Sequence, residues 1–253
     1  SVENGIIINL DHSNYNLESG IRIYDNLSIK KTSDRYSYVL PYYSFNREIT
    51  QNYFDGNTIF SSSGSNQLSN TNTLQTRIIN NLNYNSLNSI SNFGVRSNFG
   101  INLKNLNSIG KKSSSYKSTA QSELISLYNI DVGLPLIKEN EKAKNLLTPR
   151  LSFRFNPSDM KNFSGTSRSI DAHNAFTIGR LGLSDSFESG RSLTLGLEYK
   201  NEKKYDKRKN KNDLDYINNY FELKLATVIR DKEEKHIPRN TTLHRKNSNL
   251  FGS

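Results

Sequence analysis

The chain has 253 residues, and 34 Lys and Arg against 24 Asp and Glu give it a net charge of +10. Only 34% of its residues are hydrophobic, and a compact water-soluble α/β enzyme would need more aliphatic residues for its core. No apolar run approaches the ~18 residues that a transmembrane helix requires. Aromatic residues make up 10% of the chain, which argues against complete disorder.

Cysteine is absent, which excludes disulfides, a thiol nucleophile and Cys-ligated metal centres. The chain begins Ser-Val-Glu-Asn without a signal peptide, and it ends in residues typical of the start of a strand. We therefore expect one domain, residues 1–253, that is an internal part of a longer protein.

Two-residue alternation dominates the chain. Its clearest example is 191–200, where Leu193, Leu195 and Leu197 fall on one face and polar residues on the other, as in a strand with one apolar face. We expect eleven strands, in chain order at 5–10, 17–29, 34–47, 52–62, 73–86, 92–105, 118–133, 147–156, 172–181, 191–201 and 217–229. The polar stretches 61–72, 108–117, 201–213 and 231–246 are predicted to connect them.

Long strands, Tyr and Phe near strand ends, and a mean hydropathy of −0.71 favour a membrane protein with a wet interior. The predicted fold is all-β, an antiparallel up-and-down transmembrane β-barrel segment, seen here as an incomplete barrel or curved sheet. A soluble all-β sandwich or solenoid has the same alternation and stays open as an alternative. Pro41 lies within a predicted strand and should interrupt its pairing, because proline has no N–H to donate.

Motifs for chemistry are weak. The four His residues form no His-Glu-x-x-His motif, and Gly110-Lys111-Lys112-Ser113 has Asn105 where a phosphate loop needs glycine. Asp185 and Glu188 are interpreted as solvated turn residues rather than an acid/base pair. We therefore predict no enzyme activity, no catalytic residue, no metal site and no cofactor.

A basic stretch, 200–211, carries seven Lys and Arg against Glu202 and Asp206. Tyr205 is its only aromatic residue, so the interleaving needed for base stacking is poor, and nucleic acid is not an expected partner. We interpret the stretch as a hairpin loop that repels self-association or meets anionic head groups.

A specific resemblance covers roughly 33–253. The blocks 147–157 and 178–199 resemble the barrel of the LPS-assembly protein family, LptD, also called OstA or the organic-solvent-tolerance family. The most specific piece is Arg-Leu, then an acidic residue, then Gly before an alternating strand. Its residues here are Arg180, Leu181, Asp185 and Gly190.

The resemblance implies a protein of the outer membrane of a Gram-negative bacterium. Such a barrel receives lipopolysaccharide from a periplasmic Lpt bridge, encloses an LptE-type lipoprotein plug, contacts outer-membrane lipid and makes no chemical bond. The family's N-terminal periplasmic domain and closing strands are expected to lie outside this chain. Another outer-membrane barrel, of porin or receptor type, or a soluble secreted β-sheet protein remains the alternative.

Strand phase predicts which charges would line such a lumen. Side chains of mixed sign would permit weak contact at many sites, as permeation through a pore requires. The predicted lumen-facing residues are Arg96, Lys104, Arg150, Arg154, Glu198, Lys200, Glu222 and Lys224.

Overall fold

A computed structural model describes the chain except for residues 29–34, 51–54, 71, 141, 184 and 206–215. Its elements are β1 (Val2–His12), β2 (Tyr15–Asp25), β3 (Tyr36–Ile49), β4 (Gly56–Ser69), β5 (Thr73–Ser86), β6 (Ser89–Ile90), β7 (Arg96–Lys111), β8 (Gln121–Gly133), β9 (Leu136–Glu139), β10 (Ala143–Asn156), β11 (Gly190–Tyr205), β12 (Tyr216–Arg230), the 3₁₀ turn η1 (Thr242–His244) and β13 (Phe251–Gly252).

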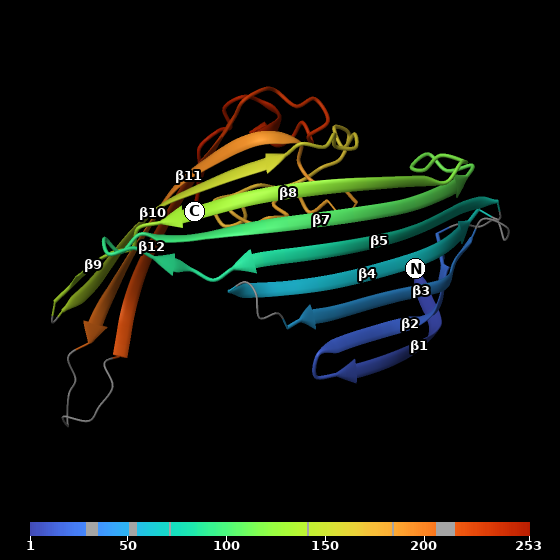
Figure 1. The fold of residues 1–253 in the computed structure, drawn as a ribbon, viewed down its shortest axis with the longest axis horizontal. Coiled ribbons are helices and arrows are strands. Elements are labelled where there is room, and N and C mark those ends of the chain that lie inside the picture. The colour runs from blue at the N-terminus through green and yellow to red at the C-terminus, as the bar shows by residue number, and fades with distance from the viewer. Residues whose placement is uncertain (29–34, 51–54, 71, 141, 184, 206–215) are drawn as a thin grey trace. The chain divides into compact units, whose positions relative to one another are not determined.

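The strands form a 13-stranded sheet in the order β1-β2-β3-β4-β5-β7-β8-β10-β11-β12-β13, with β6 beside β7 and β9 beside β10 (Figure 1). Neighbours along this order follow one another in the chain, and the pairings with a defined register are antiparallel. The prediction of an all-β, antiparallel, up-and-down sheet is therefore confirmed. Ten of the eleven predicted strands correspond to β1–β5, β7, β8 and β10–β12.

The predicted strand at 172–181 is wrong, because these residues form successive turns. The Asp171 carboxylate accepts hydrogen bonds from the backbone N–H groups of His173 and Asn174, both at 2.9 Å. The Ala175 N–H donates to the Asp171 carbonyl at 3.0 Å, which closes a helix-like turn. The apolar residues Ala172 and Ala175 are spaced for this turn and pack together on Ala226 of β12.

The predicted connectors are also partly wrong. Residues 61–69 belong to β4, where Ser61 and Ser62 stand opposite asparagines of β5; Ser62 donates to Asn80 at 2.7 Å. A strand that pairs through polar side chains is rich in Ser and Asn, so its composition resembles that of a loop. Residues 231–246 do connect two strands, β12 and β13, as predicted, but Ile237 and Leu243 within them are fully buried. Residues 206–211 of the basic stretch lie outside the described residues, and residues 200–205 belong to β11.

Pro41 does interrupt pairing, as predicted. The register between β2 and β3 shifts between Gly20 and Arg22, and that between β3 and β4 shifts between Val39 and Tyr42. The local bulge accommodates the missing N–H.

The chain divides into two compact units. Unit 1 comprises residues 1–86 and 101–126, and unit 2 comprises residues 87–100 and 127–253. The two hydrophobic clusters found among the described residues, around Val228 and Ala226, both lie in unit 2. In the described part of the chain, no helix has the length and apolarity needed to cross a membrane.

Candidate functional site

The strands β10–β12 of unit 2 present two unlike faces. Odd-numbered side chains form an apolar face, on which Leu195 stands opposite Leu151 of β10 and Leu193 opposite Ile229 of β12. This face is exposed rather than packed. The side chains that show 37–39% exposure there are Leu151, Phe153, Leu195, Leu197, Leu223 and Ile229.

Even-numbered side chains form the polar face. Its upper half, which we define as the half that carries Ser152, Ser192 and Thr194, is covered by other parts of the chain. Ser152, Thr194 and Ser192 are 5% exposed or less. Two segments without strands lie over them: residues 157–189, between β10 and β11, and residues 231–250, after β12, drawn in yellow to orange and in red in Figure 1. A soluble sheet exposes its polar face and buries its apolar one, and here the arrangement is reversed.

Apolar contacts join these two segments to the sheet. Met160 and Leu181 of the first segment pack with Ile237 and Leu243 of the second on Val228 of β12. All five side chains are 5% exposed or less. The segments therefore share one small core whose floor is the polar face itself.

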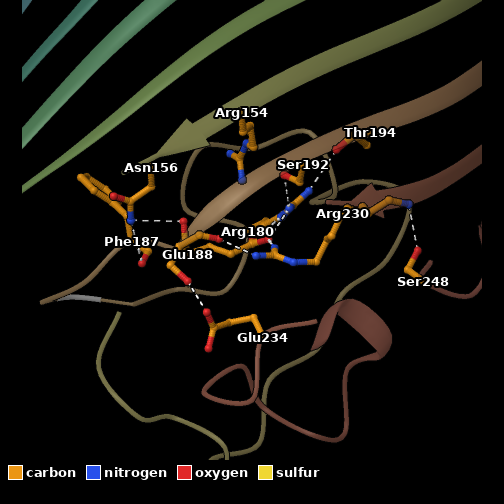
Figure 2. Close-up of polar contacts among 12 residues, drawn as sticks. Arg154, Asn156, Arg180, Phe187, Glu188, Ser192, Thr194, Arg230, Glu234 and Ser248 are labelled. Atoms are coloured by element: carbon orange, nitrogen blue, oxygen red, sulfur yellow. Dashed lines mark hydrogen bonds and ion pairs between the residues drawn. The ribbon is translucent and has the colours of Figure 1, made fainter. Parts of the chain in front are cut away.

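A cluster of charges is buried beside this core (Figure 2). The guanidinium of Arg180 donates to both carboxylate oxygens of Glu188, at 2.6 and 2.7 Å, in a bidentate pair. It also donates at 3.0 Å to the hydroxyls of Ser192 and Thr194 on β11. Arg230 of β12 donates to the same carboxylate and to the Ser189 carbonyl. Thus Glu188 joins an arginine of the covering segment to an arginine of the sheet.

The charged side chains of this cluster are almost completely buried. The side chains of Arg180 and Arg230 are 1% exposed, and that of Glu188 is 9% exposed. Burial alone would raise the pKa of Glu188, but its attraction to Arg180, the hydrogen bonds from that residue, and the charges of Arg230 and Arg154 lower it to about 2. The carboxylate is therefore ionised throughout the physiological range.

Further contacts join this charge cluster to β10 and to the second covering segment. Arg154 of β10 is 4% exposed and donates to the Thr177 carbonyl of the covering segment. The Ser189 hydroxyl donates to Glu234 of the second segment at 2.5 Å. Gly190 follows with a φ of +79°, a conformation that glycine adopts without the steric cost of a side chain. This residue turns the chain from the cluster into β11.

Phe176 marks the lower limit of the covered half. Its ring lies over the Arg150 guanidinium, with 4.3 Å between the guanidinium carbon and the ring centroid. Gly196 leaves room for the ring, since a Cβ at this position would come within 2.5 Å of it. The contact depends on the absence of a side chain on the strand.

Below Phe176 the polar face carries a ladder of ion pairs. Arg150 pairs with Glu198 at 2.7 Å, Lys200 with Glu202 at 2.5 Å, and Lys224 with Glu222 at 2.9 Å. Glu198 stands opposite Lys224, and Lys200 opposite Glu222, in the register of β11 and β12. We call these six residues the charge ladder. They are partly exposed and alternate in sign, so they can contact a polar ligand without one dominant charge.

The lumen-facing predictions fall into three groups. Arg150, Glu198, Lys200, Glu222 and Lys224 are brought together in the charge ladder. Arg154 has the expected phase but lies in the buried cluster. The remaining two belong to β7: Lys104 is 6% exposed and Arg96 is exposed at the start of the strand.

The four motif residues 180, 181, 185 and 190 gather in one place. Arg180 and Gly190 flank the buried carboxylate, and Leu181 lies in the shared core. Asp185 pairs with Lys161 at 3.4 Å. Arg180 and Leu181 of the motif thus contact the sheet, whereas Asp185 pairs within the covering segment.

Two central residues are not predicted from the sequence. The interpretation of Glu188 as a solvated turn residue is wrong, and Arg230 is not among the predicted site residues. The available signal is a pair of arginines, Arg180 and Arg230, in segments that resemble strand ends, with a carboxylate between them in the chain. That signal has no fixed spacing, because the contacts form only in the folded sheet.

No model of a known protein family matches the chain, and no curated protein matches it. In the described residues, no group of three or more His, Asp or Glu side chains is placed to bind a metal ion.

Proposed function

We propose that this chain is part of the wall of an outer-membrane translocon that carries lipopolysaccharide to the outer leaflet. The observation that carries the membrane part of the proposal is the reversal of faces in β10–β12. The apolar face is exposed, and half of the polar face is covered. Lipid on the apolar side and water on the other would satisfy both.

The choice of lipopolysaccharide rests on the resemblance of 147–157 and 178–199 to the LPS-assembly family. The charge ladder is compatible with that cargo. A phosphorylated glycan needs polar partners along its path, and alternating signs prevent tight binding at any single step. The proposed activity is transport without bond formation, with an LptE-type plug and a periplasmic bridge as partners.

Site-specific photo-crosslinking tests the cargo. A photoreactive amino acid at Lys200 or Lys224, in the protein as it exists in the cell envelope, should give adducts that antibodies against lipopolysaccharide detect. The matched control is Leu195 on the apolar face, which should crosslink to bilayer lipid instead. Adducts with small solutes only, and none with lipopolysaccharide, would favour the porin or receptor alternative.

Membrane fractionation tests the location separately. The protein should sediment with outer membranes and resist extraction by carbonate, because its apolar face is solvated by acyl chains. Recovery in the soluble fraction would contradict the membrane proposal, whatever the crosslinking result.

A further inference from the structure

The two covering segments are held on the sheet in different ways. Residues 231–250 bond to the backbone of β12, from the Arg230 N–H to the Lys246 carbonyl at 2.6 Å and from the Ser248 N–H to the Val228 carbonyl at 2.8 Å. Residues 157–189 depend mainly on side-chain contacts. Among the described residues they contain no strand and no helix beyond η1. Their apolar contacts with the sheet are small: Val228 is the strand residue among the five buried members of one cluster, and Ala226 is the strand residue in a second cluster with Ala172 and Ala175. Irregular segments with small cores are the parts of a protein that open most easily.

Charge contacts hold residues 157–189 on the sheet, and they converge on one carboxylate. Glu188 accepts from Arg180 of the segment and from Arg230 of the sheet. The same Arg180 reaches Ser192 and Thr194 of β11, so its orientation fixes the segment on that strand. Figure 2 shows these side chains directed toward one another from three parts of the chain.

We propose that Glu188 acts as a lock, which keeps residues 157–189 on β10–β12 as an internal plug and whose loss uncovers the upper polar face while the sheet stays folded. Without the carboxylate, Arg180 and Arg230 would be two buried, uncompensated cations close together. Residues 157–189 can relieve that repulsion by leaving the sheet, since Arg180 then becomes solvated. The strand pairing of β10–β12 does not depend on it.

Opening would change what the polar face presents. Ser152 and Thr194, which are 1% and 0% exposed, lie on the same face as the charge ladder, directly above it. Release of the plug would extend the ladder into a longer polar surface. This opening involves the covered half of the polar face and does not depend on whether lipopolysaccharide is the ligand of the charge ladder.

The absence of cysteine from the chain allows a direct test. A single Ser152→Cys substitution adds a thiol under the plug, and Ser152 has no hydrogen-bond partner for its hydroxyl among the described residues. A second single-cysteine variant, Ser108→Cys in β7 of unit 1, reports on the rest of the sheet, because Ser108 is 6% exposed. Both are labelled with a water-soluble maleimide in the full chain, folded in detergent or in buffer as its solubility requires.

The lock is then removed by Glu188→Gln or Glu188→Ala, and Glu233→Gln changes an exposed neighbouring carboxylate as the control. We expect maleimide labelling at position 152 to become at least about tenfold faster in both Glu188 variants and to stay slow in the control. Labelling at position 108 should remain slow throughout.

Two results would overturn the inference. Unchanged labelling at position 152 in both Glu188 variants would mean that the plug is kept in place by other contacts. Fast labelling at positions 152 and 108 together would mean that the carboxylate supports the whole fold rather than a local lock.

Discussion

Units 1 and 2 satisfy the polar groups of their strands in different ways. In unit 2, polar side chains gather on one face, where irregular segments and a buried charge cluster cover them. In unit 1, a row of uncharged side chains hydrogen-bonds directly across the strands. The row links Tyr43 to Ser62 at 3.0 Å, Ser62 to Asn80 at 2.7 Å, Asn80 to Asn105 at 3.3 Å and Asn105 to Ser122 at 3.3 Å.

The position of this row makes the contrast sharper. Asn80 lies on the same face of β5 as Ile78 and Leu82, which are 38% and 37% exposed. The apolar face of unit 1 is therefore crossed by polar groups that serve as partners for one another. On the exposed apolar face of β10 and β11, by contrast, three successive pairs are apolar on both strands: Pro149 with Leu197, Leu151 with Leu195 and Phe153 with Leu193. Asparagine is abundant in the first part of the chain because it both donates and accepts across such a row.

The largest expected effect is at the charge cluster. Glu188→Ala should lower the free energy of unfolding by about 3–5 kcal/mol, since it leaves buried arginines without their counterion. Denaturant titration measures this, and Glu233→Ala, at an exposed site, should change it little. A loss no larger than that of the control would contradict the central place given to Glu188.

The second effect tests the apolar faces of the two units. Leu195→Arg should cost about 2–4 kcal/mol if the residue faces the middle of a bilayer. Ile78→Arg in unit 1 should cost less, because Asn80 lies two residues away on the same face and can accept from the guanidinium. Refolding into lipid vesicles with denaturant titration compares the two. A near-neutral Leu195→Arg would count against a lipid-facing orientation.

Acid should weaken unit 2 through Glu188. Its pKa falls from an ordinary 4.5 to about 2 on folding, so its stabilising contribution is complete above pH 4.5 and is lost as the pH falls toward 2. Glu234 has a lowered pKa as well, because burial is outweighed by its bonds to Ser189 and His236, and adds in the same direction. Unfolding free energies measured from pH 6 to pH 2 should decline less steeply in Glu188→Gln, and equal slopes would refute the assignment.

The smallest effect is expected in the hydrogen-bonded row. Asn80→Ala removes two of its side-chain bonds and should cost about 0.5–1.5 kcal/mol. Asn83→Ala, on the opposite face of β5, serves as the control and should be close to neutral. A cost at position 80 equal to that of Glu188→Ala would remove the distinction drawn between the units.

The sequence predicted the alternation of side chains along each strand. It did not predict the contacts between segments that are distant in the chain. Alternation at 191–200 correctly predicted β11 and the polar phase of Glu198 and Lys200. The same alternation at 172–181 predicted a strand that does not form, because Ala172 and Phe176 belong to turns that pack on β12. Glu188 looked like a turn residue because its partners, Arg180 apart, come from distant strands and leave no local pattern.

The most direct test of the reversed faces uses the absence of tryptophan from the chain. Single-tryptophan variants Leu195→Trp and Lys224→Trp, refolded into vesicles of brominated lipid, place one fluorophore on each face of the same sheet. We predict strong quenching of the tryptophan at position 195 and little quenching at position 224. Equal quenching at both positions, or quenching only at 224, would contradict the proposal that the apolar face of β10–β12 meets lipid.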